Sequence, residues 1–198
     1  MSDHILVLHP VHPFAASNDV LTLENRLIEI GFLGEKYNWF DDVHFRLGSQ
    51  FFKFINFDHS HITILLENSQ DGLKEVGETD SRYLCHIQIT NVVAEPGFLG
   101  AANTLPPLCP NCDYEATDDP FKAIGNWYDN KANFMWVCPN CKSSFPIHEL
   151  NWRKTAGFAR QEIRIWEVQA DEAVPTDELL AHLENITGEK WTYFYYHL

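Results

Sequence analysis

Two copies of the tetrapeptide Cys-Pro-Asn-Cys, at residues 109–112 and 138–141, restrict the fold of this 198-residue chain more than any other feature. Two cysteines separated by two residues can direct both sulfurs at one ion from a single tight turn, and a second such turn completes a tetrahedron. The proline in each copy fixes φ at a value that suits the turn and removes one backbone donor. The spacing therefore predicts a metal site with four ligands, Cys109, Cys112, Cys138 and Cys141.

Both turns resemble the knuckles of zinc ribbons, small modules in which two Cys-Pro-x-Cys turns clamp one zinc ion. The resemblance covers about residues 105–150, with Asn133–Val137 expected to enter the second knuckle as a strand and Lys142–Pro146 to leave it. It implies one structural Zn²⁺ per chain, because four cysteine ligands leave no open coordination position. Ribbons often carry glycine after the second cysteine, where this chain has Asp113 and Lys142. Positive φ is easier for Asp than for Lys at such a position.

Two alternatives to zinc use the same cysteines. A rubredoxin-like iron site has the same four thiolates, and sequence separates iron from zinc poorly. Disulfides require an oxidising compartment, whereas the start Met1–His4 lacks the basic residues of a signal peptide, so we expect a cytoplasmic protein with reduced thiols. No apolar run approaches the roughly 20 residues of a membrane helix.

The charge of the chain argues against nucleic-acid binding. The formal net charge is −14, and residues 105–150 contain six acidic residues against three lysines. A module that follows phosphates should show the opposite balance. The one basic stretch contains Glu162 and is expected to be a solvated or ion-paired face, with a phosphate or carboxylate site as the alternative; it comprises Arg153, Lys154, Arg160 and Arg164.

The pattern of apolar residues predicts an α+β fold, with a mainly antiparallel sheet and helices on one face. Helices are expected from a cap at Ser17 or Asn18 and over Asp177–Asn185. The expected strands are Ile5–Leu8, Phe51–Phe57, Ile62–Leu66, Tyr83–Thr90, Glu162–Val168 and Trp191–His197, with an acidic loop over Glu67–Ser81. Residues 1–104 and 151–198 would form this domain, with a zinc-ribbon insertion at 105–150. Gly34–Tyr37 and Gly188–Trp191 follow the first and last helices with similar sequences, which leaves ferredoxin-like halves open.

Other reactive side chains have simpler interpretations. Cys85 shares an apolar strand face with Ile87 and Ile89, while His86 points the other way, so Cys85 is expected to pack rather than react. The histidines His59 and His61, with Asp58 nearby, form a weak metal pattern, and His9 and His12 a weaker one. Adjacent carboxylates usually lie in water. The two such pairs are Asp41–Asp42 and Asp118–Asp119.

These observations predict a non-enzymatic, acidic protein that binds a basic protein partner, in an adaptor or immunity-like role. No catalytic residue is assigned. The alternative is a small enzyme or ligand-binding protein with a site in a cleft of the α+β domain, using His59, His61 or Cys85. A nucleic-acid binder is the third alternative. The aromatic C-terminal segment Trp191–Leu198 is expected to pack in the core, or to offer a partner surface.

Overall fold

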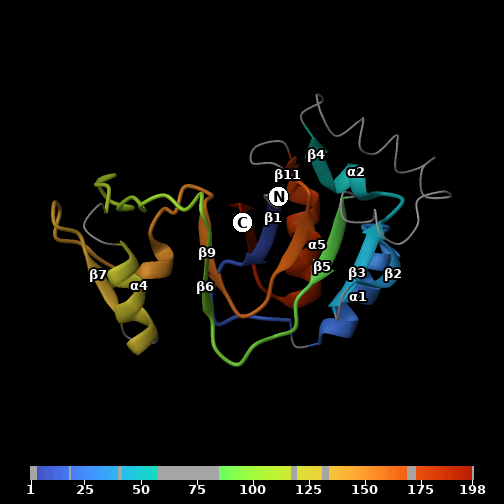
Figure 1. The fold of residues 1–198 in the computed structure, drawn as a ribbon, viewed down its shortest axis with the longest axis horizontal. Coiled ribbons are helices and arrows are strands. Elements are labelled where there is room, and N and C mark those ends of the chain that lie inside the picture. Colours follow the sequence, from blue (N-terminus) through green and yellow to red (C-terminus); the bar gives the residue numbers. More distant parts are fainter. Residues whose placement is uncertain are drawn as a thin grey trace.

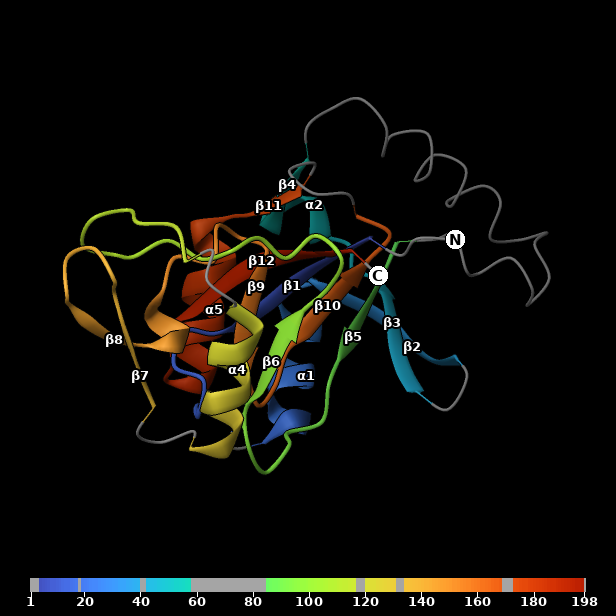
Figure 2. The same ribbon diagram turned by 60° about the vertical axis from the view of Figure 1, so that its left-hand side comes forward.

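The computed structural model describes residues 4–17, 19–39, 42–57, 85–116, 120–130, 134–168 and 173–197. Its elements form two groups that lie side by side (Figure 1). The larger group contains the main sheet with two long helices. The smaller group contains the two Cys-Pro-Asn-Cys turns, a helix and a short hairpin. Figure 2 shows the long helices α1 (Val20–Glu29) and α5 (Asp177–Thr187) beside the main sheet.

Six strands form the main sheet in the order β12-β1-β10-β5-β3-β2, and all neighbouring pairs are antiparallel. This confirms the predicted α+β class. The strands are β1 (His4–Pro10), β2 (Leu33–Trp39), β3 (Asp42–Leu47), β5 (His86–Ile89), β10 (Ile163–Trp166) and β12 (Trp191–His197).

The strand directions contain a split βαβ arrangement. Because every neighbouring pair is antiparallel, β1 and β5 run in the same direction with β10 between them, and β10 and β12 do so with β1 between them. The order β12-β1-β10-β5 is that of a ferredoxin-like sheet. The hairpin β2–β3 extends this sheet beyond β5 and lies between α1 and β5 in the sequence. Duplication of the two halves stays a prediction.

One face of the main sheet packs against the helices, as predicted. Alternate strand residues such as Leu6, Ile87 and Ile165 form a buried core with Leu23 of α1 and Leu183 of α5. The opposite face holds a smaller buried cluster of Ile5, Val7 and Phe194. The C-terminal strand therefore packs on both faces, because Trp191 and Tyr195 belong to the first core and Phe194 to the other cluster.

Capping residues define the start of α1 and the end of α5, although the N-cap of α1 differs from the predicted one. Asp19, rather than Ser17 or Asn18, caps α1, and its side chain accepts a hydrogen bond from the backbone N–H of Leu21. Ser17 supports this cap by accepting from the backbone N–H of Asp19 at 3.2 Å. The helix α5 ends at Gly188, whose φ of 75° suits glycine.

The strand predicted over Phe51–Phe57 is wrong in its first half. Residues Phe51–Phe54 form the short helix α2, and only Ile55–Phe57 form a strand, β4, which pairs with β11 (Ala173–Pro175). Phe51 and Phe54, three residues apart, are both buried in the main core, which a helical turn permits and a strand does not. Ile62–Leu66 and Glu67–Ser81 lie outside the described residues.

The smaller group has its own buried cluster, which includes Trp127, Trp152 and Phe158. Its elements are β6 (Gly97–Gly100), α4 (Pro120–Asp129), β7 (Met135–Val137), β8 (Ser144–Pro146), the 3₁₀ turn η2 (Ile147–Glu149) and β9 (Ala156–Ala159). Sequence reasoning missed α4, although Pro120 at its first position and the pair Ile124 and Trp127 are helical signals.

The chain enters and leaves the cysteine-containing segment at one place. Leu108 and Asn151 form an isolated antiparallel bridge, with N–H to O distances of 2.9 and 3.0 Å in the two directions. The buried cluster of this group also takes in Phe98, Trp152 and Phe158, which lie outside 105–150. The division into a domain of residues 1–104 and 151–198 and an insertion at 105–150 stays a prediction.

Two glycine substitutions should have opposite effects on stability. A Cβ at Gly157 would lie 2.7 Å from His9 Nε2 and 3.0 Å from a Phe194 ring carbon, so Gly157→Ala should lower the free energy of unfolding by about 1–3 kcal/mol. A Cβ at Gly125, within α4, meets nothing within 4 Å, so Gly125→Ala should raise stability by about 0.5–1 kcal/mol. Urea unfolding of both variants measures these changes, and equal effects would contradict the packing around Gly157.

Candidate metal centre

The two Cys-Pro-Asn-Cys turns have the same backbone hydrogen bonds. In the first turn, the N–H of Cys109 donates to the carbonyl of Tyr114 at 2.9 Å, and the N–H of Asp113 donates to the carbonyl of Cys109 at 3.0 Å. In the second turn, Cys138 donates to Ser143 at 2.9 Å and Lys142 donates to Cys138 at 3.0 Å. The repeated tetrapeptide therefore folds into one local structure twice.

The residue after each turn has a left-handed backbone. The φ angles of Asp113 and Lys142 are 54° and 62°. These are the two positions at which ribbons often have glycine. At Lys142 the side chain adds a local contact, because its Nζ donates to the carbonyl of Pro139 at 2.7 Å.

The fold brings all four predicted sulfur atoms together. The ligand atoms of Cys109, Cys112, Cys138 and Cys141 lie within 4.8 Å of one another. Two pairs that link the turns, Cys109 with Cys141 and Cys112 with Cys138, have sulfur–sulfur distances of 3.7 Å. A zinc–sulfur bond of about 2.3 Å gives tetrahedral sulfur–sulfur edges of about 3.8 Å. The cluster is therefore close enough to share one tetrahedral metal ion.

The four cysteine sulfurs differ in the polar groups that surround them. Asn140 Nδ2 donates to the sulfur of Cys112 at 3.5 Å, and Asn111 Nδ2 donates to Ser143 Oγ at 3.2 Å. Hydrogen bonds from Ser143 and Asn111 lower the pKa of Cys141 to about 5, whereas burial raises the pKa of Cys109 to about 11. Such contacts from outside the ligand set orient metal-bound thiolates. The sequence pattern indicated the turn role of both asparagines but not these contacts.

The structure gives the remaining cysteine and two of the histidines no metal-site geometry. Cys85 is partly buried against the main core, and burial raises the pKa of its thiol to about 12, which disfavours a reactive thiolate. His9 is buried, which lowers its pKa to about 4, and its Nδ1 lies 2.8 Å from the carbonyl of Pro10. The ring of His12 lies 6.2 Å from that of His148. Among the described residues, the four cysteines are the only cluster with metal-ligand spacing.

Several other candidates fall where the structure describes nothing. Asp58, His59 and His61 lie outside the described residues, as do Asp41, Asp118 and Asp119. Asp42, at the start of β3, is exposed.

Sequence reasoning also missed a buried cluster of histidine and tryptophan rings. His44 and His86 are 3% and 2% exposed, and their ring centres lie 4.9 Å apart. The Trp39 ring contacts both, and the Trp166 ring stacks on His86 at 5.7 Å. Alternation could have found it, because His44 and His86 are sequence neighbours of the core residues Phe45 and Ile87 and so point to the other face of the sheet.

None of the helices in the described part of the chain combines the length and the apolar composition needed to cross a bilayer. Comparison of the chain with protein-family models, curated proteins and solved structures finds no match.

Proposed function

We propose that the four cysteines hold one structural Zn²⁺ per chain, in a cytoplasmic protein that acts by binding another protein rather than by catalysis. The observation that carries the metal assignment is the approach of all four sulfurs to within 4.8 Å. Zinc suits a closed set of four thiolates and contributes folding energy to small modules. Iron accepts the same ligands, so metal analysis of the purified protein distinguishes the two.

Two properties support a protein-binding role. First, the net charge of −14 favours association with a basic partner. Second, Met135 and Val137 on the β7 strand, next to the second cysteine turn, are 45% and 55% exposed. They are two residues apart and therefore share one strand face. An exposed apolar strand face on a chain with a net charge of −14 suits a basic protein that also offers an apolar contact.

A pull-down from the native cell with the metal-loaded protein tests this role. We expect one stoichiometric basic protein, released by added salt and held less well by the double variant Met135→Ser/Val137→Ser. Val174→Ser is the matched control, because Val174 is 39% exposed on β11, away from the cysteine turns. Binding that the double variant and salt leave unchanged, or no stoichiometric basic protein, would contradict the proposal.

A further inference from the structure

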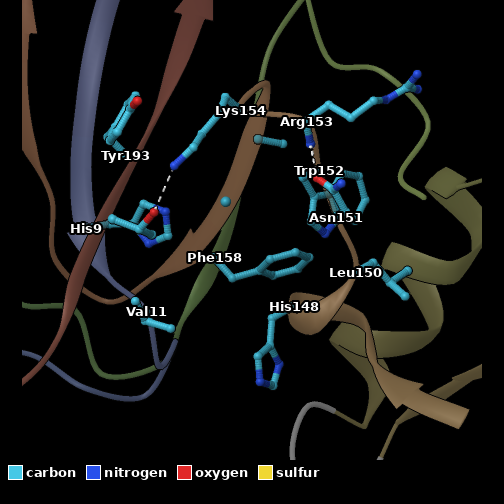
Figure 3. Close-up of a pocket in the computed structure, with 13 residues that line it drawn as sticks. His9, Val11, His148, Leu150, Asn151, Trp152, Arg153, Lys154, Phe158 and Tyr193 are labelled. Atoms are coloured by element: carbon cyan, nitrogen blue, oxygen red, sulfur yellow. Dashed lines mark hydrogen bonds between the residues drawn. The ribbon is translucent and has the colours of Figure 1, made fainter. Parts of the chain in front are cut away.

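A cavity of about 210 Å³ lies between the main sheet and the smaller group of elements. Residues of β1, β9 and β12 form one side, and the segment from His148 to Lys154 forms the other (Figure 3). The cavity is smaller than the roughly 300–1,000 Å³ of typical drug-sized sites, so any ligand it takes is small.

The ammonium group of Lys154 lies at this cavity and has no carboxylate partner among the described residues. Its Nζ is 3.1 Å from Thr192 Oγ1 and 3.8 Å from the centre of the Tyr193 ring. Within the part of the chain that the structure describes, Lys154 makes no ion pair. The residue as a whole is exposed, but its ammonium is withdrawn enough that burial lowers the pKa of Lys154.

The described residues of the lining carry no negative charge, although the chain as a whole has a net charge of −14. None of the lining residues that the structure describes is Asp or Glu. Arg153 also borders it, but its side chain extends away in Figure 3 and pairs with Glu115 at 3.1 Å. Burial keeps His9 neutral by lowering its pKa to about 4. Among the described lining residues, Lys154 is therefore the one cation directed at the cavity.

The rest of the lining combines apolar side chains with polar ones such as His148 and Asn151. Phe158 lies in the middle of the cavity wall in Figure 3, with Val11 and Leu150 to either side. The β9 backbone comes close to His9 at Gly157, where a Cβ would lie 2.7 Å from His9 Nε2. The cavity thus combines one positively charged position, at Lys154, with a wall that is apolar in part.

We propose that this cavity binds a small organic carboxylate, with its carboxylate on Lys154 Nζ and its apolar body in the part of the cavity lined by Val11 and Phe158. A carboxylate would complete the charge-assisted hydrogen bonding of an ammonium whose contacts in the described part of the chain include the Thr192 hydroxyl and the Tyr193 ring. An apolar body would displace water from the wall. This site is separate from the cysteine cluster and from the protein-binding role proposed above.

Titration of the metal-loaded full chain with benzoate, butyrate and inorganic phosphate, followed by calorimetry or by NMR, tests the site. We expect saturable binding of the carboxylates, with benzoate tighter than butyrate, and weaker binding of phosphate. Lys154→Met should weaken carboxylate binding by at least about tenfold, since a hydrogen bond to a charged group is lost. Methionine keeps an unbranched stem at this position, where φ is 58°.

Lys190→Met is the matched control, because Lys190 is exposed and does not line the cavity. It removes the same charge and should leave binding unchanged. Lys154→Arg keeps the charge and should retain binding. It shows whether a loss in Lys154→Met comes from the missing charge or from a change in folding at this position. Absence of saturable carboxylate binding, equal losses in Lys154→Met and Lys190→Met, or phosphate binding as tight as benzoate would overturn the proposal.

Discussion

Replacing Cys138 with serine should remove the bound metal and unfold the smaller group of elements. Binding of a structural zinc is worth about 10–16 kcal/mol in small modules, which is comparable to the whole stability of a typical domain. Cys138 is fully buried, and its sulfur lies 3.7 Å from that of Cys112, so serine cannot replace it as a ligand of equal strength. Metal content should fall from about one ion per chain, and limited proteolysis should cut within 105–150.

Cys85→Ala is the control for this variant. It removes the one cysteine that lies outside the two turns, so it should keep the full metal content and the same proteolysis pattern. A Cys138→Ser protein with its metal and its protease resistance intact would show that the cluster is not a metal site.

Phe158→Ala should cause the second large effect, a loss of folding stability. Phe158 is 2% exposed, and its ring centre lies 4.8 Å from that of Trp127, 5.2 Å from that of Phe98 and 5.6 Å from that of Trp152. Removal of a buried phenylalanine side chain typically costs 3–5 kcal/mol, so we expect a loss of about this size in urea unfolding followed by tryptophan fluorescence.

The matched control for Phe158 is Phe52, which is 49% exposed, so Phe52→Ala should cost less than about 1 kcal/mol. Comparable losses of stability in the two variants would contradict the packing described for Phe158.

The number of unfolding transitions is also informative, because β9 packs beside β1 and β12 as well as in the smaller cluster. One shared transition would indicate that the two groups unfold together, whereas two would support a separate domain.

Features that depend on neighbouring residues were predictable from the sequence. The spacing of the four cysteines predicted the cluster, and the non-glycine residues Asp113 and Lys142 were recognised as the positions that need positive φ. Alternating strands such as Trp191–His197 were also found, since each face carries its own periodic signal.

Features that depend on distant partners were not predictable in the same way. The place of β10 between β1 and β5 is set by pairing across more than seventy residues, and no local pattern specifies it. The helix α2 was read as a strand because Phe51–Phe57 is a short, mostly apolar run, which suits either structure until burial decides between them. The helix α4 was missed because its segment was assigned to a ribbon loop.

The bridge between Leu108 and Asn151 brings the two ends of the cysteine-containing segment together, as in an inserted module. The chain returns to within hydrogen-bonding distance of the point where it left, at 2.9 and 3.0 Å. An excursion whose two ends touch can be lengthened, exchanged or excised at little cost in chain closure, since that cost grows only slowly with loop length. The host sheet can therefore tolerate changes in the size of this segment during evolution, or in protein engineering, provided that the residues at the junction keep their contact and the buried cluster around Phe158 stays filled.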